Sequence, residues 1–210
     1  MREISLLIIC FFTIGITKAQ QKAVTETGDQ VILYDDGVWK YQDENQQLER
    51  KIRINPKKFE RDENSTFLLK SKNLNIGYYL NPKQWSFNKS IENPDAEYEL
   101  ALKGEDLYGL IITERVEIPL ETLRSIALEN GKTIVPDLKI VNQEYRTVNG
   151  LKVLQIRMDG NMQGIKITYY GYYYSNDKGT VQFITYTSQN LLDSYLPEIE
   201  KLLNGIVELN

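Results

Sequence analysis

The amino-acid sequence predicts an α+β protein, in which an antiparallel β-sheet is flanked by helices and preceded by an N-terminal β-hairpin. Two observations predict this fold class. Strand patterns occur in adjacent pairs joined by short glycine-containing turns. Two segments with apolar residues at helical spacing accompany these strands. Residues 65–210 are long enough to bury one hydrophobic core, so a single domain is expected there.

The first 19 residues have the pattern of a secretory signal peptide. Arg2 precedes an apolar run over 4–16, and Thr17-Lys18-Ala19 places small residues where signal peptidase recognises them. The run is shorter than the roughly 20 residues that cross a bilayer, so no transmembrane segment is expected after cleavage. The only cysteine, Cys10, lies inside the run in a context that disfavours lipidation. The protein is therefore predicted to be exported, and to be periplasmic or secreted.

A β-hairpin is predicted within residues 20–41. Strands at 30–34 and 38–41 flank an Asp-Gly pair, which tolerates the positive φ of tight hairpin turns. The segment resembles a short hairpin found directly after the signal peptide of many exported bacterial proteins. The residues that carry this resemblance are Tyr34, Asp36, Gly37, Trp39 and Tyr41. Because an isolated hairpin is marginal in water, we expect it to add strands to a partner or to the sheet of its own chain.

Residues 42–64 are predicted to form a charged linker. Twelve of these 23 residues are Asp, Glu, Lys or Arg, which is too polar a composition for a core element. The large apolar residues of the segment are Leu48, Ile52, Ile54 and Phe59.

Six strands are predicted in the domain of residues 65–210. The first two, 97–103 and 107–113, form a hairpin across a turn at 104–106. The other four form an antiparallel meander at 138–148, 151–158, 164–174 and 180–187. The turns of the meander are expected at Asn149-Gly150, 159–161 and 176–179.

Two helices are predicted beside these strands. The first begins at Pro119, a residue that suits a first turn, and is expected to end at Gly131. Its apolar face consists of Leu120, Leu123, Ile126 and Ala127. The second spans about 191–204, with Pro197 as a break or first turn and Gly205 after the C-terminus.

The order of these elements resembles the PsbP-like superfamily, of the Mog, PsbP and DcrB types. The residues that carry the resemblance are the Gly171-Tyr-Tyr-Tyr174 strand, the Gly179-Thr-Val-Gln-Phe183 strand and the closing helix over 192–206. The resemblance covers about residues 65–207 and implies an α/β/α sandwich. The superfamily shares no catalytic motif, and its studied members mostly act as binding or assembly factors. The resemblance therefore implies that the protein is not an enzyme.

Composition excludes several kinds of chemistry. The chain has no histidine, so Ser-His-Asp catalysis and histidine-based zinc sites are excluded. Any reaction would depend on carboxylates, lysine, hydroxyl groups or tyrosine. The formal net charge of −4 argues against nucleic acid and anionic membranes as main partners. We expect no metal and no cofactor.

Three short motifs imitate catalytic or binding sites without the context that such sites need. Ser86 and Lys89 match Ser-x-x-Lys but lie in extended chain, where they face opposite sides. Residues 131–133 imitate the end of a phosphate loop, but the first glycine of that motif is missing. Residues 159–164 imitate a calcium loop, but Tyr170 stands where glutamate is required. No catalytic residue is predicted.

The candidate binding surface is the tyrosine-rich strand. Strand alternation places Tyr170, Tyr172 and Tyr174 on one face, and Tyr169 and Tyr173 on the other. If a helix covered the first face only in part, its aromatic rings and hydroxyl groups would suit protein or carbohydrate recognition. The alternative is that both faces are covered and that the tyrosines fill a three-layer core.

The sequence thus predicts an exported, non-enzymatic binding or accessory protein of the bacterial cell envelope, with an envelope protein as partner. Two alternatives stay open. One is a small hydrolase that acts on carbohydrate or peptide with two carboxylates, such as a pair from Glu97, Glu99, Glu114 and Glu117. The other is an envelope carrier of a ligand or ion.

Overall fold

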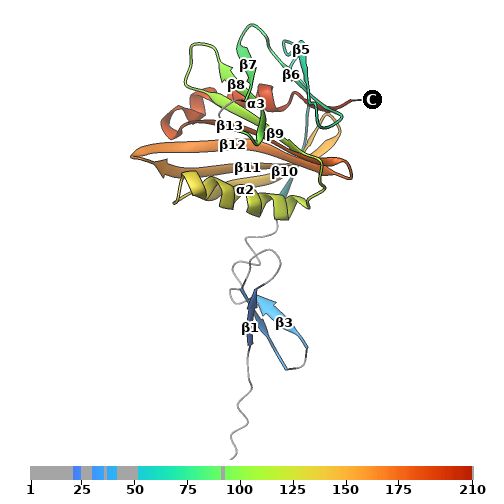
Figure 1. Ribbon diagram of the computed structural model, residues 1–210, viewed down its shortest axis with the longest axis vertical. Coiled ribbons are helices and arrows are strands. Elements are labelled where there is room, and N and C mark those ends of the chain that lie inside the picture. The colour runs from blue at the N-terminus through green and yellow to red at the C-terminus, as the bar shows by residue number, and fades with distance from the viewer. Residues whose placement is uncertain (1–20, 25–29, 36, 42–51, 91–92, 210) are drawn as a thin grey trace, which may run out of the picture. The chain divides into compact units, whose positions relative to one another are not determined.

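The computed structural model describes residues 21–24, 30–35, 37–41, 52–90 and 93–209 (Figure 1). The predicted signal peptide over 1–19 lies outside these residues. The chain divides between Arg50 and Lys51 into two compact units, which are treated separately.

The N-terminal unit contains a three-stranded antiparallel sheet in the order β1-β2-β3. Its strands are β1 (Gln21–Val24), β2 (Gln30–Leu33) and β3 (Trp39–Tyr41). Strands β2 and β3 form the predicted hairpin, which is confirmed, and β1 adds a strand that was not predicted. Gly37 has the expected positive φ of 80°, and its N–H donates to the Tyr34 carbonyl at 3.0 Å.

The C-terminal unit contains fourteen of the elements in the described chain. Its strands are β4 (Arg53–Phe59), β5 (Phe67–Lys70), β6 (Ile76–Leu80), β7 (Trp85–Lys89), β8 (Ala96–Leu102), β9 (Tyr108–Glu114), β10 (Lys139–Val148), β11 (Leu151–Met162), β12 (Ile165–Asn176), β13 (Gly179–Ser188) and β14 (Ile206–Glu208). Its helices are α2 (Leu120–Ile134), the 3-10 turn η1 (Gln189–Leu191) and α3 (Leu192–Leu203).

Two sheets form the framework of this unit. The larger has the strand order β4-β10-β11-β12-β13-β9-β8-β7, and the smaller has the order β14-β6-β5. Strands β10 to β13 form the predicted antiparallel meander, and β8 and β9 form the predicted hairpin, so both are confirmed. Strand β4 pairs with β10 in parallel. The broad prediction of an α+β fold is correct.

The larger sheet is covered on both faces (Figure 1). Helix α2 packs against β11 and β12 on one face. Helix α3 and the smaller sheet share the other face. The second cover is therefore built from helix and strand together, whereas the predicted sandwich has helices alone. Sequence patterns missed β5, β6 and β14 because such short strands carry little alternation, and β14 pairs with residues far away in the chain.

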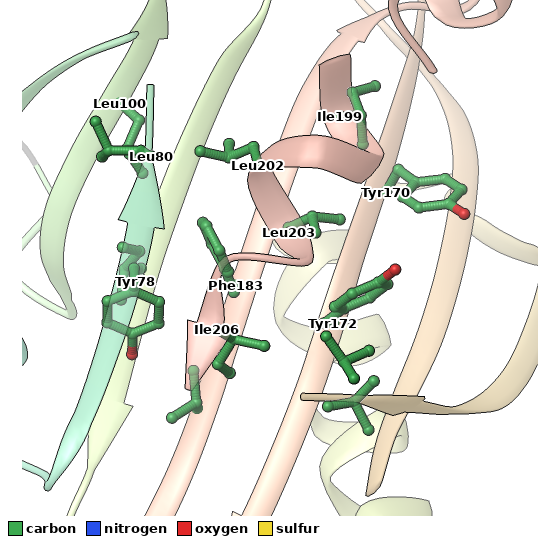
Figure 2. Packing of buried hydrophobic residues seen from close by; sticks show 14 of the residues in the cluster. Tyr78, Leu80, Leu100, Tyr170, Tyr172, Phe183, Ile199, Leu202, Leu203 and Ile206 are labelled. Carbon is green, nitrogen blue, oxygen red and sulfur yellow. The ribbon is translucent and has the colours of Figure 1, made fainter. Parts of the chain in front are cut away.

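The core under α3 is the larger of two hydrophobic clusters (Figure 2). Its buried side chains include Tyr78, Leu80, Leu100, Phe183, Ile199, Leu202, Leu203 and Ile206. The rings of Tyr78 and Phe183 meet edge to face at 5.1 Å. Each large side chain buried in this way contributes about 1.5–3 kcal/mol.

The predicted turn at 159–161 and the predicted helix end at Gly131 have a different role in the structure. Strand β11 continues through 159–161, and the chain reverses at Gln163 and Gly164, which have φ values of 53° and 90°. Gly131 lies inside α2, where a Cβ would approach Leu138 Cδ2 to 2.4 Å, so close packing explains this glycine. Gly205 follows the C-terminus of α3 as predicted, and its carbonyl accepts a hydrogen bond from the Tyr79 N–H at 2.8 Å. A Cβ at Gly205 would lie 1.9 Å from the Tyr79 carbonyl oxygen, so this contact requires glycine. Pro197 lies within α3 and does not break it.

The predicted linker extends too far. Its first part, 42–51, lies outside the described residues, but 53–59 form strand β4 at the edge of the larger sheet. The charged composition is misleading here because most of the side chains of β4 point to solvent, as is common at a sheet edge. Phe59 is the anchor, since it is buried beneath the guanidinium of Arg146, whose Cζ lies 4.5 Å from the ring centroid.

Candidate ligand-binding groove

The aromatic face predicted to bind a partner is part of the core. Tyr170, Tyr172 and Tyr174 are 7%, 0% and 7% exposed, because α3 and the smaller sheet cover them. Figure 2 shows Tyr170 and Tyr172 beside α3. The Tyr172 hydroxyl accepts a hydrogen bond from Arg146 and donates one to Asn204. The prediction of an exposed face on these three residues is therefore wrong, and the alternative of a filled core describes them.

A buried ionic network lies beside these tyrosines. Arg146 donates from Nε to Glu144 Oε1 at 2.7 Å and from Nη1 to Glu200 Oε1 at 2.9 Å. Glu144 also accepts a hydrogen bond from Asn55 at 2.9 Å. Because β4, β10 and α3 each supply a member, the network joins the sheet edge to the helix. It is a structural feature, since its charges are matched within the protein.

The opposite face of the larger sheet holds a groove. Helix α2 packs on β11 and β12, while β13 and β9 continue beyond it. A groove of about 610 Å³ lies between α2 and these strands, and we call it the α2 groove. Its floor consists of Leu110, Ile112, Met158, Tyr173, Gln182 and Ile184. Its walls include Ile126, Ala127, Asn130 and Ile134 of α2 and, opposite, Asn93, Pro94 and Asp95. Its volume is in the range of small-molecule sites.

Strand register explains which side chains form the floor. Tyr173 of β12 pairs with Gln182 of β13, which pairs in turn with Ile112 of β9. Directly paired residues point to the same face of a sheet, so these three side chains form one row. Ile184 and Leu110 are paired in the next row. The floor thus combines β9 with β11, β12 and β13, and α2 and β10 lie between these two parts in the sequence.

Two floor residues carry polar groups that the described part of the protein leaves without a hydrogen-bond partner. Tyr173 is 1% exposed and Gln182 is 7% exposed. The Tyr78 hydroxyl is fully buried in the core and has no hydrogen-bond partner among the described residues. The polar atoms of Tyr173 and Gln182 differ from it, because they are not fully enclosed. Both side chains line the α2 groove. Burial raises the pKa of the Tyr173 hydroxyl, which keeps it protonated and able to donate.

A row of tyrosines extends from the α2 groove along the sheet. Tyr169 lines the groove, and its ring lies 5.9 Å from that of Tyr186. Tyr186 stacks on Tyr108 at 5.5 Å, and Tyr108 is exposed. The accessible aromatic residues are therefore on the face opposite to the predicted one. The sequence signal was the placement of Tyr169 and Tyr173 together by strand alternation, but their neighbours on β9 and β13 depend on register.

The charge of the α2 groove is acidic. Asp95 and Glu114 line it, and no lysine or arginine is found among the described lining residues. Both carboxylates are exposed at the edge of the groove. Its interior is uncharged, with Tyr173 and Gln182 as the polar groups of the floor.

Comparison with known proteins concerns structure, since no family model and no curated protein sequence matches the chain. The chain is similar to the solution structure of cyanobacterial PsbP (CyanoP) from Synechocystis sp. PCC 6803, with a TM-score of 0.51. The match covers 70% of this chain and 94% of CyanoP at 15% identity. The larger unit has the PsbP-like fold. The resemblance inferred from the sequence is thus confirmed at the level of fold.

Two further solved structures show a weaker likeness to the PsbP-like domain. PA94 of Pseudomonas aeruginosa, a putative regulator of unknown function, has a TM-score of 0.44 at 12% identity, over 67% of this chain and 95% of PA94. LpqN of Mycobacterium tuberculosis, which is involved in cell envelope biogenesis, has a TM-score of 0.37 at 9% identity, over 80% of this chain and 97% of LpqN.

The short motifs of the PsbP-like domain have structural explanations. Ser86 lies in strand β7, as expected, and its hydroxyl donates to the Ala101 carbonyl at 3.2 Å. Residues 131–133 lie within α2. Asp159 of the apparent calcium loop forms an ion pair with Arg157 and accepts a hydrogen bond from Thr168. Across the described residues no group of three or more acidic, cysteine or histidine side chains could hold a metal ion.

The structure does not gather the four candidate carboxylates into one site. Glu97 accepts hydrogen bonds from Ser71 and Thr113. Thr113 pairs with Val181, which belongs to the core under α3. Glu99 pairs with Leu110 of the α2 groove and accepts a hydrogen bond from Ser90. A register shift between Ala96 and Tyr98 interrupts the alternation of β8, so Glu97 and Glu99 have different partners on different sides of the strand. Glu114 is the member of the four that lines the groove.

The hairpin residues of the N-terminal unit are described in part. Tyr34 donates its N–H to the Val38 carbonyl at 2.9 Å, and Trp39 is half-exposed. Asp36 and the side chain of Tyr41 lie outside the described part of the chain. Over the whole described chain no helix has the length and apolar character needed to cross a bilayer.

Proposed function

We propose that the chain is an exported, non-enzymatic binding or accessory protein of the bacterial cell envelope, and that it holds a ligand in the α2 groove. The observation that carries this proposal is the pair Tyr173 and Gln182, whose polar atoms lie on the groove floor without a partner among the described residues. Because these polar atoms are not fully enclosed, a ligand in the groove can form hydrogen bonds with both of them.

The chemistry of the floor favours binding over catalysis. A glutamine amide does not titrate, and the raised pKa of Tyr173 keeps its hydroxyl from acting as a base at neutral pH. The floor can therefore donate and accept hydrogen bonds, but it offers no proton transfer of its own.

Native co-purification tests the ligand. The protein would be purified from its own cells without detergent, extracted with organic solvent and examined by mass spectrometry. The test variant is Asn130→Trp, which places a large ring at the mouth of the groove from the exposed side of α2. Glu129→Trp is the matched control, because Glu129 is also exposed on α2 but does not line the groove. We expect a co-purifying compound with wild type and Glu129→Trp that disappears with Asn130→Trp.

Recovery of the same compounds with all three proteins would show that the α2 groove is not the site.

Export is tested separately by fractionating cells that express the full chain and measuring the mass of the processed protein. We expect a mature form that begins at Gln20, and its loss when Ile8→Arg interrupts the apolar run.

The alternative of a carboxylate-dependent hydrolase keeps one observation in its favour, since Asp95 and Glu114 both line the same groove. A panel of peptide and glycoside substrates, assayed with wild type, Asp95→Asn and Glu114→Gln, tests this alternative. Turnover that is lost in either variant would replace the binding proposal with an enzymatic one.

A further inference from the structure

We infer that the ligand of the α2 groove is an uncharged single-chain amphiphile, in which an apolar chain carries a group, such as an amide or alcohol, that donates and accepts hydrogen bonds. This inference rests on the proposed function and adds the chemical class of the ligand.

The apolar part of the ligand is inferred from the floor and walls. Leu110, Ile112 and Ile184 present aliphatic side chains from two adjacent strands. On the helix side, Ile126 and Ile134 line the groove although they are exposed, and Ile134 is 64% exposed. Exposed apolar side chains that converge on one hollow favour an apolar ligand, which would remove them from water.

The hydrogen-bonding group is inferred from Tyr173 and Gln182. Their Cα atoms are direct partners across β12 and β13, so the two side chains stand next to each other. The Gln182 amide offers donors and an acceptor, and the Tyr173 hydroxyl offers both. A ligand group with both functions satisfies the pair, whereas a plain hydrocarbon leaves it unpaired. Sites of this kind discriminate strongly against ligands that lack the polar group.

The absence of charge on the ligand is inferred from the charges of the groove. An anionic group would meet Asp95 and Glu114 and no cationic side chain among the described lining residues. A cationic group at the floor would find no carboxylate beside it, because Asp95 and Glu114 lie at the exposed edge. A quaternary ammonium group also carries no N–H or O–H, so it would leave the acceptors of Tyr173 and Gln182 without a donor. It would also lose hydration on the apolar floor. An uncharged group avoids both costs.

Calorimetric titration of the full mature protein with matched probes tests the inference. The probes share a dodecyl chain and differ in the polar group: dodecanoylglycerol, dodecanamide, dodecyl phosphate and dodecyltrimethylammonium, each kept below its micelle concentration. We expect the first two to bind, and the two charged probes to bind at least roughly ten-fold more weakly. Asn130→Trp should abolish binding and Glu129→Trp should leave it unchanged.

Two floor variants separate recognition from folding. Gln182→Leu and Tyr173→Phe remove the polar atoms and keep similar volumes. Each should weaken the binding of dodecanamide by roughly ten-fold. Each should at the same time leave the melting temperature of the free protein close to that of wild type, since the variant removes no hydrogen bond within the described residues. A residue with a merely structural role would lower both quantities together.

The outcomes distinguish the inference from the proposed function. Equal or tighter binding of a charged probe, or affinities that Gln182→Leu and Tyr173→Phe leave unchanged, overturns the inference about ligand class. Failure of every probe also overturns it, while a native compound displaced by Asn130→Trp would still support the groove as a binding site. Probe binding that is insensitive to Asn130→Trp overturns both.

Discussion

Arg146 of β10 and Glu200 of α3 form an ion pair, in which the Arg146 Nη1 donates to the Glu200 Oε1 at 2.9 Å. The same guanidinium bonds Glu144 and Tyr172, and it lies over the ring of Phe59. One buried cation thus connects the edge strand β4, the sheet and the closing helix. The connection joins distant parts of the PsbP-like domain, because β4 and α3 are at opposite ends of its chain.

Arg146→Met should destabilise the protein by about 3–5 kcal/mol, because removal of one partner leaves buried charge without compensation. Glu144 is 9% exposed and would keep Arg53, at 3.5 Å, as its remaining ionic contact. The measurement is urea denaturation at neutral pH. Lys132→Met is the matched control, since it breaks a surface pair with Glu129 and should cost at most about 0.5 kcal/mol. Equal losses in the two variants would contradict the structural role of Arg146.

The stability of the protein should fall in acid partly through Glu144. Burial pushes the pKa of Glu144 up, but hydrogen bonds from Asn55 and Arg146 outweigh this and lower the pKa below its ordinary value of 4.5. A carboxylate with a lowered folded-state pKa stabilises the fold above 4.5, and this contribution is lost as the pH falls through the folded-state pKa. The free energies of unfolding of wild type and Glu144→Gln should therefore differ most at neutral pH and converge below 4.5. A gap that stays constant with pH would show that Glu144 does not contribute in this way.

Tyr78→Phe should stabilise the protein by about 1–3 kcal/mol. The Tyr78 side chain is fully buried, and its hydroxyl has no hydrogen-bond partner within the described chain. The ring itself packs against Phe183 and would stay in place. Tyr172→Phe is the control with the opposite sign, because that hydroxyl bonds both Arg146 and Asn204. Thermal and urea denaturation measure both effects, and a loss of stability in Tyr78→Phe would reveal a partner for its hydroxyl.

Strand β4 should be required for the PsbP-like domain to fold stably. A chain of residues 51–210 should unfold cooperatively, whereas a chain of residues 65–210 should have a much lower melting temperature, because it lacks β4 and the anchor Phe59. Phe59→Ala in the longer chain should cost about 3–5 kcal/mol. Circular dichroism melting curves distinguish the three proteins. Equal stability of the two chains would restore the predicted linker over 42–64.

The parts of the fold that sequence reasoning predicted correctly depend on residues close together in the chain. Asn149-Gly150 forms the turn between β10 and β11, with positive φ at both residues. Leu123 and Ala127 form the buried side of α2, as the helical spacing predicts. Strand alternation divides Tyr172 and Tyr173 between the two cores. Each of these features depends on local turn geometry or side-chain periodicity, which a single sequence contains.

The candidate site escaped prediction because it depends on contacts between distant segments. Gln182 is an ordinary polar residue of an alternating strand until register places it between Tyr173 and Ile112. Strand alternation alone predicts an accessible aromatic face at Tyr170, Tyr172 and Tyr174. In the folded domain this face is covered by residues 67–80 and the C-terminal strand. No local pattern contains the information that α2 stops short of β13 and β9.

The sequence therefore established the hairpin of β8 and β9, the meander, the two helices, the lack of histidine chemistry and the expectation of export. Only the tertiary structure decided that the edge strand β4 belongs to the domain, which tyrosines are buried, and that Tyr173 and Gln182 lie in a groove. The division has a physical reason. Turns and periodicity arise from neighbouring residues, whereas burial is a property of whole layers, and it is set by which distant strand or helix reaches a face first.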